Sequence, residues 1–111
     1  MSIFKFCPEG WEGEVEVKKL KYVERMQLLI DSGFSISKTG EMEKMDNLLI
    51  VAIKNYELCE KTLERIELKH VESGLVAKSL EDLGESSVGM NVINEVAGMI
   101  IGGYPLEKSL R

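Results

Sequence analysis

The segment 88–101 is apolar around almost its whole circumference, and this feature constrains the fold more than any other. The large polar side chains within it are Asn91, Asn94 and Glu95. Stop signals follow directly, because Gly102 and Gly103 favour the end of a helix and Pro105 cannot continue one. The pattern predicts a helix over residues 87–101 that must be buried, either in the core of this chain or against another chain.

A second apolar helix is predicted over residues 41–61. Thr39 is a suitable N-cap, and Glu41 and Glu43 place negative charge in the first turn, where the helix dipole favours it. The core stripe of this helix comprises Met42, Met45, Leu48, Leu49, Ala52, Ile53 and Tyr56. Residues 48–53 are six consecutive apolar residues, so the apolar surface extends well past one face. This helix is therefore either central to the fold or shared with a partner.

Alternating segments predict a small antiparallel sheet. Residues 14–18 read Glu-Val-Glu-Val-Lys, which places valines on one face and charges on the other. With a short apolar strand that starts at Ile3, this segment forms an N-terminal hairpin that turns over residues 8–13. Trp11 lies in that turn, where it is either a lid over the hairpin or an exposed binding anchor. Residues 63–71 alternate again and predict one later strand.

Apolar residues at 22, 26, 29 and 30 predict a further helix over residues 22–32, which Gly33 ends. A single helical turn is expected after Ser79. The chain is therefore predicted to be a single domain over residues 1–111 with an α+β fold. A small antiparallel sheet, made of the N-terminal hairpin plus one later strand, packs with three main helices, and helices dominate.

Composition narrows the classes of function. Hydrophobic residues make up 44% of the 111 residues and charged residues 30%, a balance typical of a soluble globular domain. The net charge of −5 argues against nucleic-acid binding, which needs clustered Lys and Arg. The first ten residues lack the pattern of a secretory signal, and no apolar run approaches the roughly 20 residues that cross a bilayer. A cytoplasmic protein without a membrane partner is expected.

Reactive side chains are few. Cys7 and Cys59 form no C-x-x-C pair, so they are predicted to be two reduced, packed thiols and not a metal clip or a disulfide. His70 is the only histidine, and Glu67 three residues before it should point to the opposite face of a strand. A nucleophile and base made of Cys59 and His70 lacks an evident orienting group or oxyanion site. We expect no enzyme activity, no metal and no cofactor.

The two apolar helices instead predict a surface for other proteins. A domain of this size can enclose one helix that is apolar all round, but enclosing two is difficult, which favours self-association or a hydrophobic partner. Methionines suit such a surface because their unbranched side chains repack against many partners. The predicted partner or oligomer interface comprises Met42, Met45, Leu49, Val92, Val96, Met99 and Ile100.

The stretch GWEGEVEVKKLKYVERMQLL (residues 10–29) resembles the opening of the tail assembly chaperones of long-tailed, siphovirus-like bacteriophages. In that family a G-W-x-G turn and a charged strand lead into a helix with an R-M-x-L-L core. The matching residues here are Gly10, Trp11, Gly13, Arg25, Met26, Leu28 and Leu29. The later order is also similar: a Met- and Leu-rich helix (42–56), an I-E-L-K strand (66–69), a short E-D-L element (81–83) and an apolar last helix closing on G-x-P-L (103–106).

This resemblance implies a non-enzymatic chaperone that binds the hydrophobic tape measure protein and helps recruit tail tube subunits around it, as a homo-oligomer in the host cytoplasm. The alternative is a small cytosolic regulatory or adaptor domain that acts as a homodimeric protein-binding module. The alternative predicts a closed symmetric interface, whereas a coat on a tape measure protein can use open, head-to-tail contacts.

Overall fold

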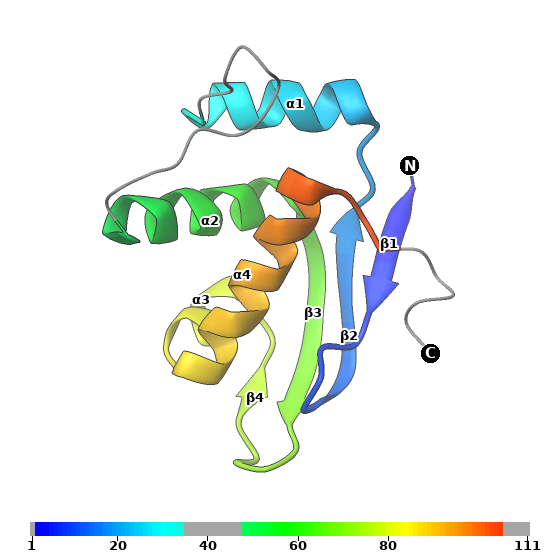
Figure 1. Ribbon diagram of the computed structural model, residues 1–111. Coiled ribbons are helices and arrows are strands. Elements are labelled where there is room, and N and C mark those ends of the chain that lie inside the picture. The colour runs from blue at the N-terminus through cyan, green and yellow to red at the C-terminus, as the bar shows by residue number, and fades with distance from the viewer. Residues whose placement is uncertain (1, 35–47, 106–111) are drawn as a thin grey trace.

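Four antiparallel strands form one sheet in the order β1-β2-β3-β4 (Figure 1). The computed structural model describes residues 2–34 and 48–105, in which the strands are β1 (Ile3–Phe6), β2 (Trp11–Lys18), β3 (Leu63–His70) and β4 (Val76–Ala77). The N-terminal hairpin and the later strand confirm the predicted sheet, although β2 begins at Trp11 and not at Glu14. The prediction missed β4, because two residues are too few to show an alternating pattern.

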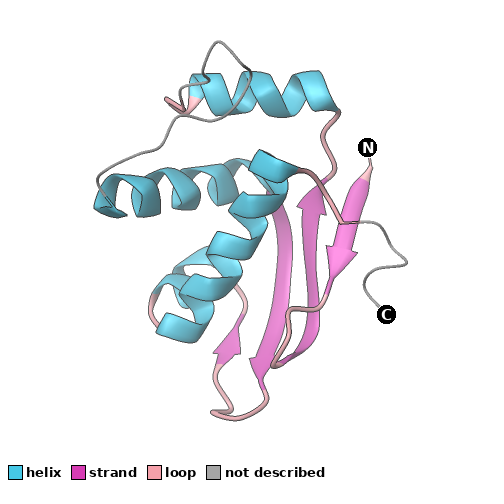
Figure 2. Ribbon diagram, in the orientation of Figure 1, coloured by secondary structure: helices cyan, strands magenta, loops and turns pink. Residues whose placement is uncertain are grey.

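The two faces of the sheet differ in the way that alternation predicts. The inward side chains are apolar and buried: Phe4, Phe6, Trp11, Val15, Val17, Ile66 and Leu68. The outward face is charged, and Arg65 on β3 makes ion pairs of 2.9 Å with Glu16 and 2.7 Å with Glu67. This face therefore needs no cover. Figure 2 shows the helices gathered on the other side of the sheet.

Gly13 is the second glycine of the G-W-x-G segment, and its position in the sheet requires a glycine. Its φ is +115°, and a Cβ there would collide with the backbone carbonyl of Glu67 on the paired strand. Trp11 at the start of β2 is buried and contacts the His70 ring edge-on, with ring centroids 4.9 Å apart. Trp11 is therefore a lid on the core, and its alternative reading as an exposed binding anchor is wrong.

The helices are α1 (Tyr22–Asp31), α2 (Leu48–Thr62), α3 (Leu80–Gly84) and α4 (Ser87–Gly102). Within the described ranges they match the predicted three main helices and one short turn. The predicted start of the second helix at residues 41–47, with its N-cap at Thr39, lies outside the described residues. Ser79 and Ser86 cap α3 and α4, since their hydroxyls accept hydrogen bonds from the backbone N–H groups of Asp82 and Gly89.

One face of α4 forms the centre of the core. Its buried residues are Gly89, Val92, Ile93, Val96, Ala97, Met99 and Ile100. The sheet, α1, α2 and α3 all pack against this face, so a single chain does bury it. The prediction that Val92, Val96, Met99 and Ile100 form a surface for partners is therefore wrong, because these side chains already lie in the interior of the subunit.

The junction between β2 and α1 is tied to the end of α4. The Tyr104 hydroxyl donates a hydrogen bond of 2.7 Å to the carbonyl of Lys18 and accepts one of 3.0 Å from the N–H of Leu20. Arg25 of α1 donates to the carbonyl of Ile100 at 3.0 Å, where a cation also complements the negative end of the helix dipole. The Arg-Met segment and the final Gly-x-Pro segment of the sequence thus meet in one structural clamp.

Replacing Tyr104 by phenylalanine should lower the free energy of unfolding by about 1–2 kcal/mol. The loss comes from two part-buried hydrogen bonds, one of which leaves the N–H of Leu20 without its partner. Urea denaturation followed by circular dichroism measures the change. Tyr22→Phe is the matched control, because Tyr22 is exposed and should change stability by less than about 0.5 kcal/mol. Equal stabilities of the two variants would show that the clamp contributes nothing.

Candidate functional site

Of the five predicted interface residues that the structure describes, one lies on the surface. Leu49, near the start of α2, has 76% of its surface exposed. Met42 and Met45 lie outside the described residues, and the four residues of α4 are in the core. Among the described residues, the exposed side of α2 is therefore the part of the predicted interface that remains accessible.

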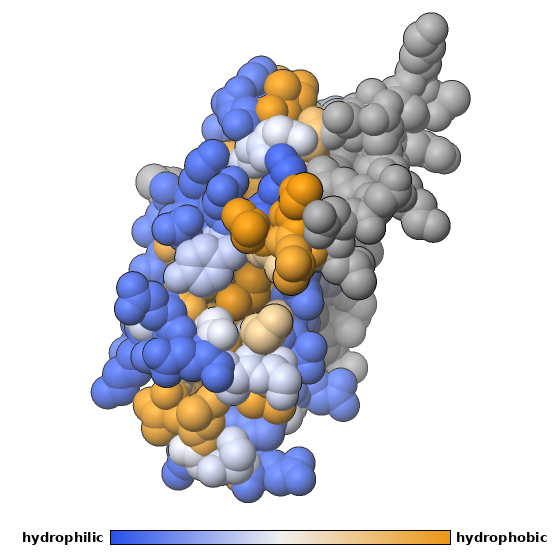
Figure 3. Space-filling view, turned by 90° about the vertical axis from the view of Figure 1, so that its left-hand side faces the viewer, coloured by the Kyte–Doolittle hydropathy of each residue, from blue (hydrophilic) through white to orange (hydrophobic). Residues whose placement is uncertain are grey.

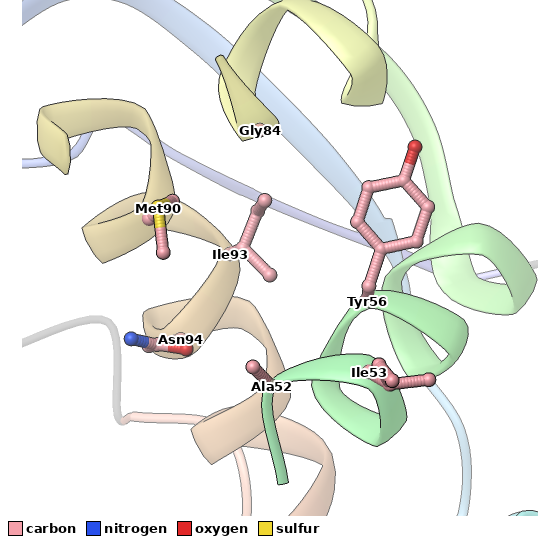
Figure 4. Close-up of a pocket in the computed structure, with 7 residues that line it drawn as sticks. All are labelled: Ala52, Ile53, Tyr56, Gly84, Met90, Ile93 and Asn94. Atoms are coloured by element: carbon pink, nitrogen blue, oxygen red, sulfur yellow. The ribbon is translucent and has the colours of Figure 1, made fainter. Parts of the chain in front are cut away.

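A hollow of about 270 Å³ lies on that side, between α2, α3 and α4. Its lining residues are Ala52, Ile53 and Tyr56 of α2, Gly84 of α3, and Met90, Ile93 and Asn94 of α4. Figure 4 shows the Ile93 side chain between α4 and Tyr56, with Gly84 of α3 beyond them. Almost all of this lining is apolar.

The shape of the hollow follows from how the three helices pack. Leu58 and Cys59, in the second half of α2, are fully buried, and the Cys59 thiol donates to the carbonyl of Ile93 at 3.4 Å. On the other wall α3 approaches α4 closely, since a Cβ on Gly89 would collide with the backbone carbonyl of Leu83. The side of α2 that carries Ile53 therefore remains uncovered, and α4 forms the floor of the hollow beside it.

The rim of the hollow carries exposed apolar side chains. Ile53 and Met90, on opposite walls, have 59% and 47% of their surface exposed, whereas Ile93 in the floor has 5%. Leu49 lies one turn before Ile53 on the same side of α2. Figure 3 shows hydrophobic atoms gathered around and inside this hollow. An apolar hollow with exposed apolar residues at its rim is a candidate binding site for a protein or a ligand.

The polar groups at the hollow come from two side chains in its lining. The Asn94 amide accepts a hydrogen bond of 3.2 Å from Asn55, which links α4 to α2. Partial burial, followed by the nearby carboxylates of Glu60 and Glu81, raises the pKa of the Tyr56 phenol. Tyr56 therefore stays neutral at physiological pH and can donate or accept a hydrogen bond.

The residues that sequence analysis considered for catalysis are not brought together. The Cys59 thiol on α2 donates to the carbonyl of Ile93, whereas the His70 ring at the end of β3 packs against Trp11. Burial raises the pKa of the Cys59 thiol to about 12, which keeps it protonated and a poor nucleophile at neutral pH. His70 is instead paired with Ser73, whose hydroxyl lies 2.8 Å from the ring nitrogen Nδ1.

The structure also tests the predictions made for Glu67 and for the two cysteines. Glu67 points outward to Arg65 while His70 contacts Trp11 on the inner side, as predicted for residues three apart on a strand. Both cysteines are free thiols, but only Cys59 is packed, since Cys7 is exposed. Over the described residues, no three His, Cys, Asp or Glu side chains are grouped so that they could hold a metal ion.

Comparisons with protein-family models, with curated proteins and with solved structures found no match to this chain. Of the helices in the described ranges, none is both long enough and apolar enough to cross a membrane.

Three of the seven lining residues of the hollow stood out in the sequence as apolar positions of one helix face. Ala52, Ile53 and Tyr56 belong to the predicted apolar stripe of α2, but that stripe faces the hollow while Leu58 and Cys59 supply the core contacts. The residues of α3 and α4 were missed. The sequence signal for them was the spacing of Met90 and Asn94, which are one turn apart and therefore lie on the same side of α4. The structure shows that Met90 is exposed on that side.

Proposed function

We propose that this chain is a non-enzymatic protein-binding module that holds an apolar helical segment of a client protein in the hollow between α2, α3 and α4. The observation that carries the proposal is the exposed apolar rim of Ile53 and Met90 over the rigid floor of Ile93. Small-molecule sites enclose about 300–1,000 Å³, so a shallower hollow suits anchoring side chains that project from a helix.

The proposed client is the tape measure protein of a long-tailed bacteriophage, with tail tube subunits recruited afterwards in the host cytoplasm. The resemblance of residues 10–29 and of the later motifs to tail assembly chaperones supports this client. An exposed apolar hollow is also what a chaperone of a long, hydrophobic helix requires. The methionine in the rim suits a client with many similar apolar segments, because it can repack against each of them.

Co-expression tests the proposal directly. A fragment of the tape measure protein encoded in the same genome is produced with and without this chain. We expect the fragment to be soluble, and to copurify with the chain, only when both are present. A fragment that stays insoluble in both cases, or that is soluble without copurifying, would contradict the proposal.

Homo-oligomerisation belongs to the same proposal. The outer side of α1 exposes a second apolar strip, made of Tyr22, Val23 and Ile30, away from the hollow. Burying such a strip between copies of the chain is favourable in proportion to the apolar area removed from water. We expect the mass from light scattering to rise between micromolar and millimolar concentration, and a constant monomer mass would exclude self-association in this range.

A further inference from the structure

We propose that the client helix carries lysine or arginine side chains beside its apolar anchors, because the edge of the hollow formed by α2 and α3 is acidic. This inference rests on the proposed function and specifies the chemistry of the partner.

Carboxylates line the α2 and α3 edge. Glu60 lies one turn after Tyr56 on α2, and Glu81 lies on α3, and both are exposed. Both are close enough to the Tyr56 phenol to raise its pKa, so their negative potential reaches a side chain that lines the hollow. Glu85 follows Gly84 of the lining and adds a third exposed carboxylate.

The basic side chains of α2 point to its other side. Lys54 donates to the carbonyl of Ser32 at 2.9 Å, and Lys61 donates to the hydroxyl of the same serine at 3.3 Å. Both lysines are thereby held against the end of α1. The charged residue within α4 is Glu95. Burial, followed by the nearby carboxylate of Glu9, raises the pKa of the Glu95 carboxyl.

Two further basic residues lie near α3, and neither neutralises the edge. Arg65 is held on the outward face of the sheet by Glu16 and Glu67. Lys78 comes just before the N-cap of α3 and, together with Arg65, borders the same surface depression as Glu60. Because Arg65 is already paired with two carboxylates, Lys78 is left to offset Glu60, Glu81 and Glu85, and the edge keeps a net negative charge. Within the described chain, the carboxylates of Glu60 and Glu81 form no ion pair.

A helix that enters the hollow with its apolar side therefore places the residues flanking that side beside these carboxylates. Exposed opposite charges attract weakly and are screened by salt, so they select the partner and speed its association more than they add affinity. A helix flanked by Glu or Asp would meet like charges and be rejected.

Two synthetic amphipathic peptides with the same Leu and Ile stripe test the inference, one flanked by lysines and the other by glutamates. At about 20 mM salt the lysine peptide should bind roughly tenfold more tightly, and at about 0.5 M salt the difference should shrink to less than about threefold. In the Glu60→Lys/Glu81→Lys variant the preference should disappear or reverse. Fluorescence anisotropy measures both affinities.

The control variant is Glu9→Lys/Glu72→Lys, which changes the net charge equally at exposed carboxylates in the two turns of the sheet and should keep the preference. Equal binding of both peptides to the unmodified chain would overturn the inference while leaving the proposed function intact. If neither peptide binds but the tape measure fragment is still held, the inference again falls alone. If the fragment is not held either, both proposals fall.

Discussion

Replacing Ile53 and Met90 together by aspartate should weaken binding of a tape measure fragment about 100-fold. Each side chain is an apolar anchor in the rim of the hollow, and losing two such anchors in a desolvated contact costs about 3 kcal/mol, with tenfold in affinity for each 1.4 kcal/mol. The free protein should lose little stability, because about half of each side chain is already exposed to water and surface substitutions usually change stability by less than about 0.5 kcal/mol. Titration calorimetry measures the dissociation constant.

The matched control is Val71→Asp. Val71 is also an exposed apolar residue, at 60%, but it lies in the turn after β3, far from the hollow. This variant should bind the fragment as the unmodified chain does. Circular dichroism establishes that all variants fold. An affinity of the Ile53→Asp/Met90→Asp variant within about threefold of the original would show that the client binds elsewhere.

Replacing Val96 by aspartate should unfold the protein. Val96 has no exposed surface and lies in the middle of the buried face of α4. An unpaired carboxylate there must either lose its hydration or take up a proton, and the cost of several kcal/mol is comparable to the total stability of about 5–15 kcal/mol of a small domain. A thermal melt should show no cooperative transition at room temperature or above.

Asn91→Asp is the control for Val96→Asp, because it introduces the same side chain into the same helix on its exposed side. This variant should melt within a few degrees of the original protein. A Val96→Asp variant that stays folded and monomeric would mean that α4 is not enclosed by its own chain. The original interpretation of this helix as a partner surface would then return.

Elements with a clear local pattern were predicted from the sequence, whereas an element without one was missed. Periodicity predicted the bounds of β3, α1 and α4 to within one residue, whereas β2 begins three residues before its predicted start. Alternation also identified the buried faces of β2 and β3, but in α1 Tyr22 and Ile30 of the predicted apolar face are exposed. The glycines at 102 and 103 marked the end of α4 correctly. The same reasoning failed for β4, whose two residues pair with Leu68 and Lys69 but carry no pattern of their own.

The candidate site was harder to predict than the fold. Hydrophobicity established that α4 must be covered, but it could not distinguish cover by the same chain from cover by another, since an apolar side chain gains the same free energy in either place. In the structure, the buried face of α4 is covered by its own chain. On α2 the side of Ile53 stays exposed in the single chain, because α3 packs against α4 at Gly89 and does not cover it.

The sequence by itself determined the α+β class and the identity of most elements. It also showed that two helices carry apolar residues beyond a single face. These properties depend on local spacing along the chain, where each residue reports its own need for burial. Only the tertiary structure decided which apolar surface remains exposed. That outcome depends on how three helices from distant parts of the chain approach one another, and the pattern of a single element holds no record of it.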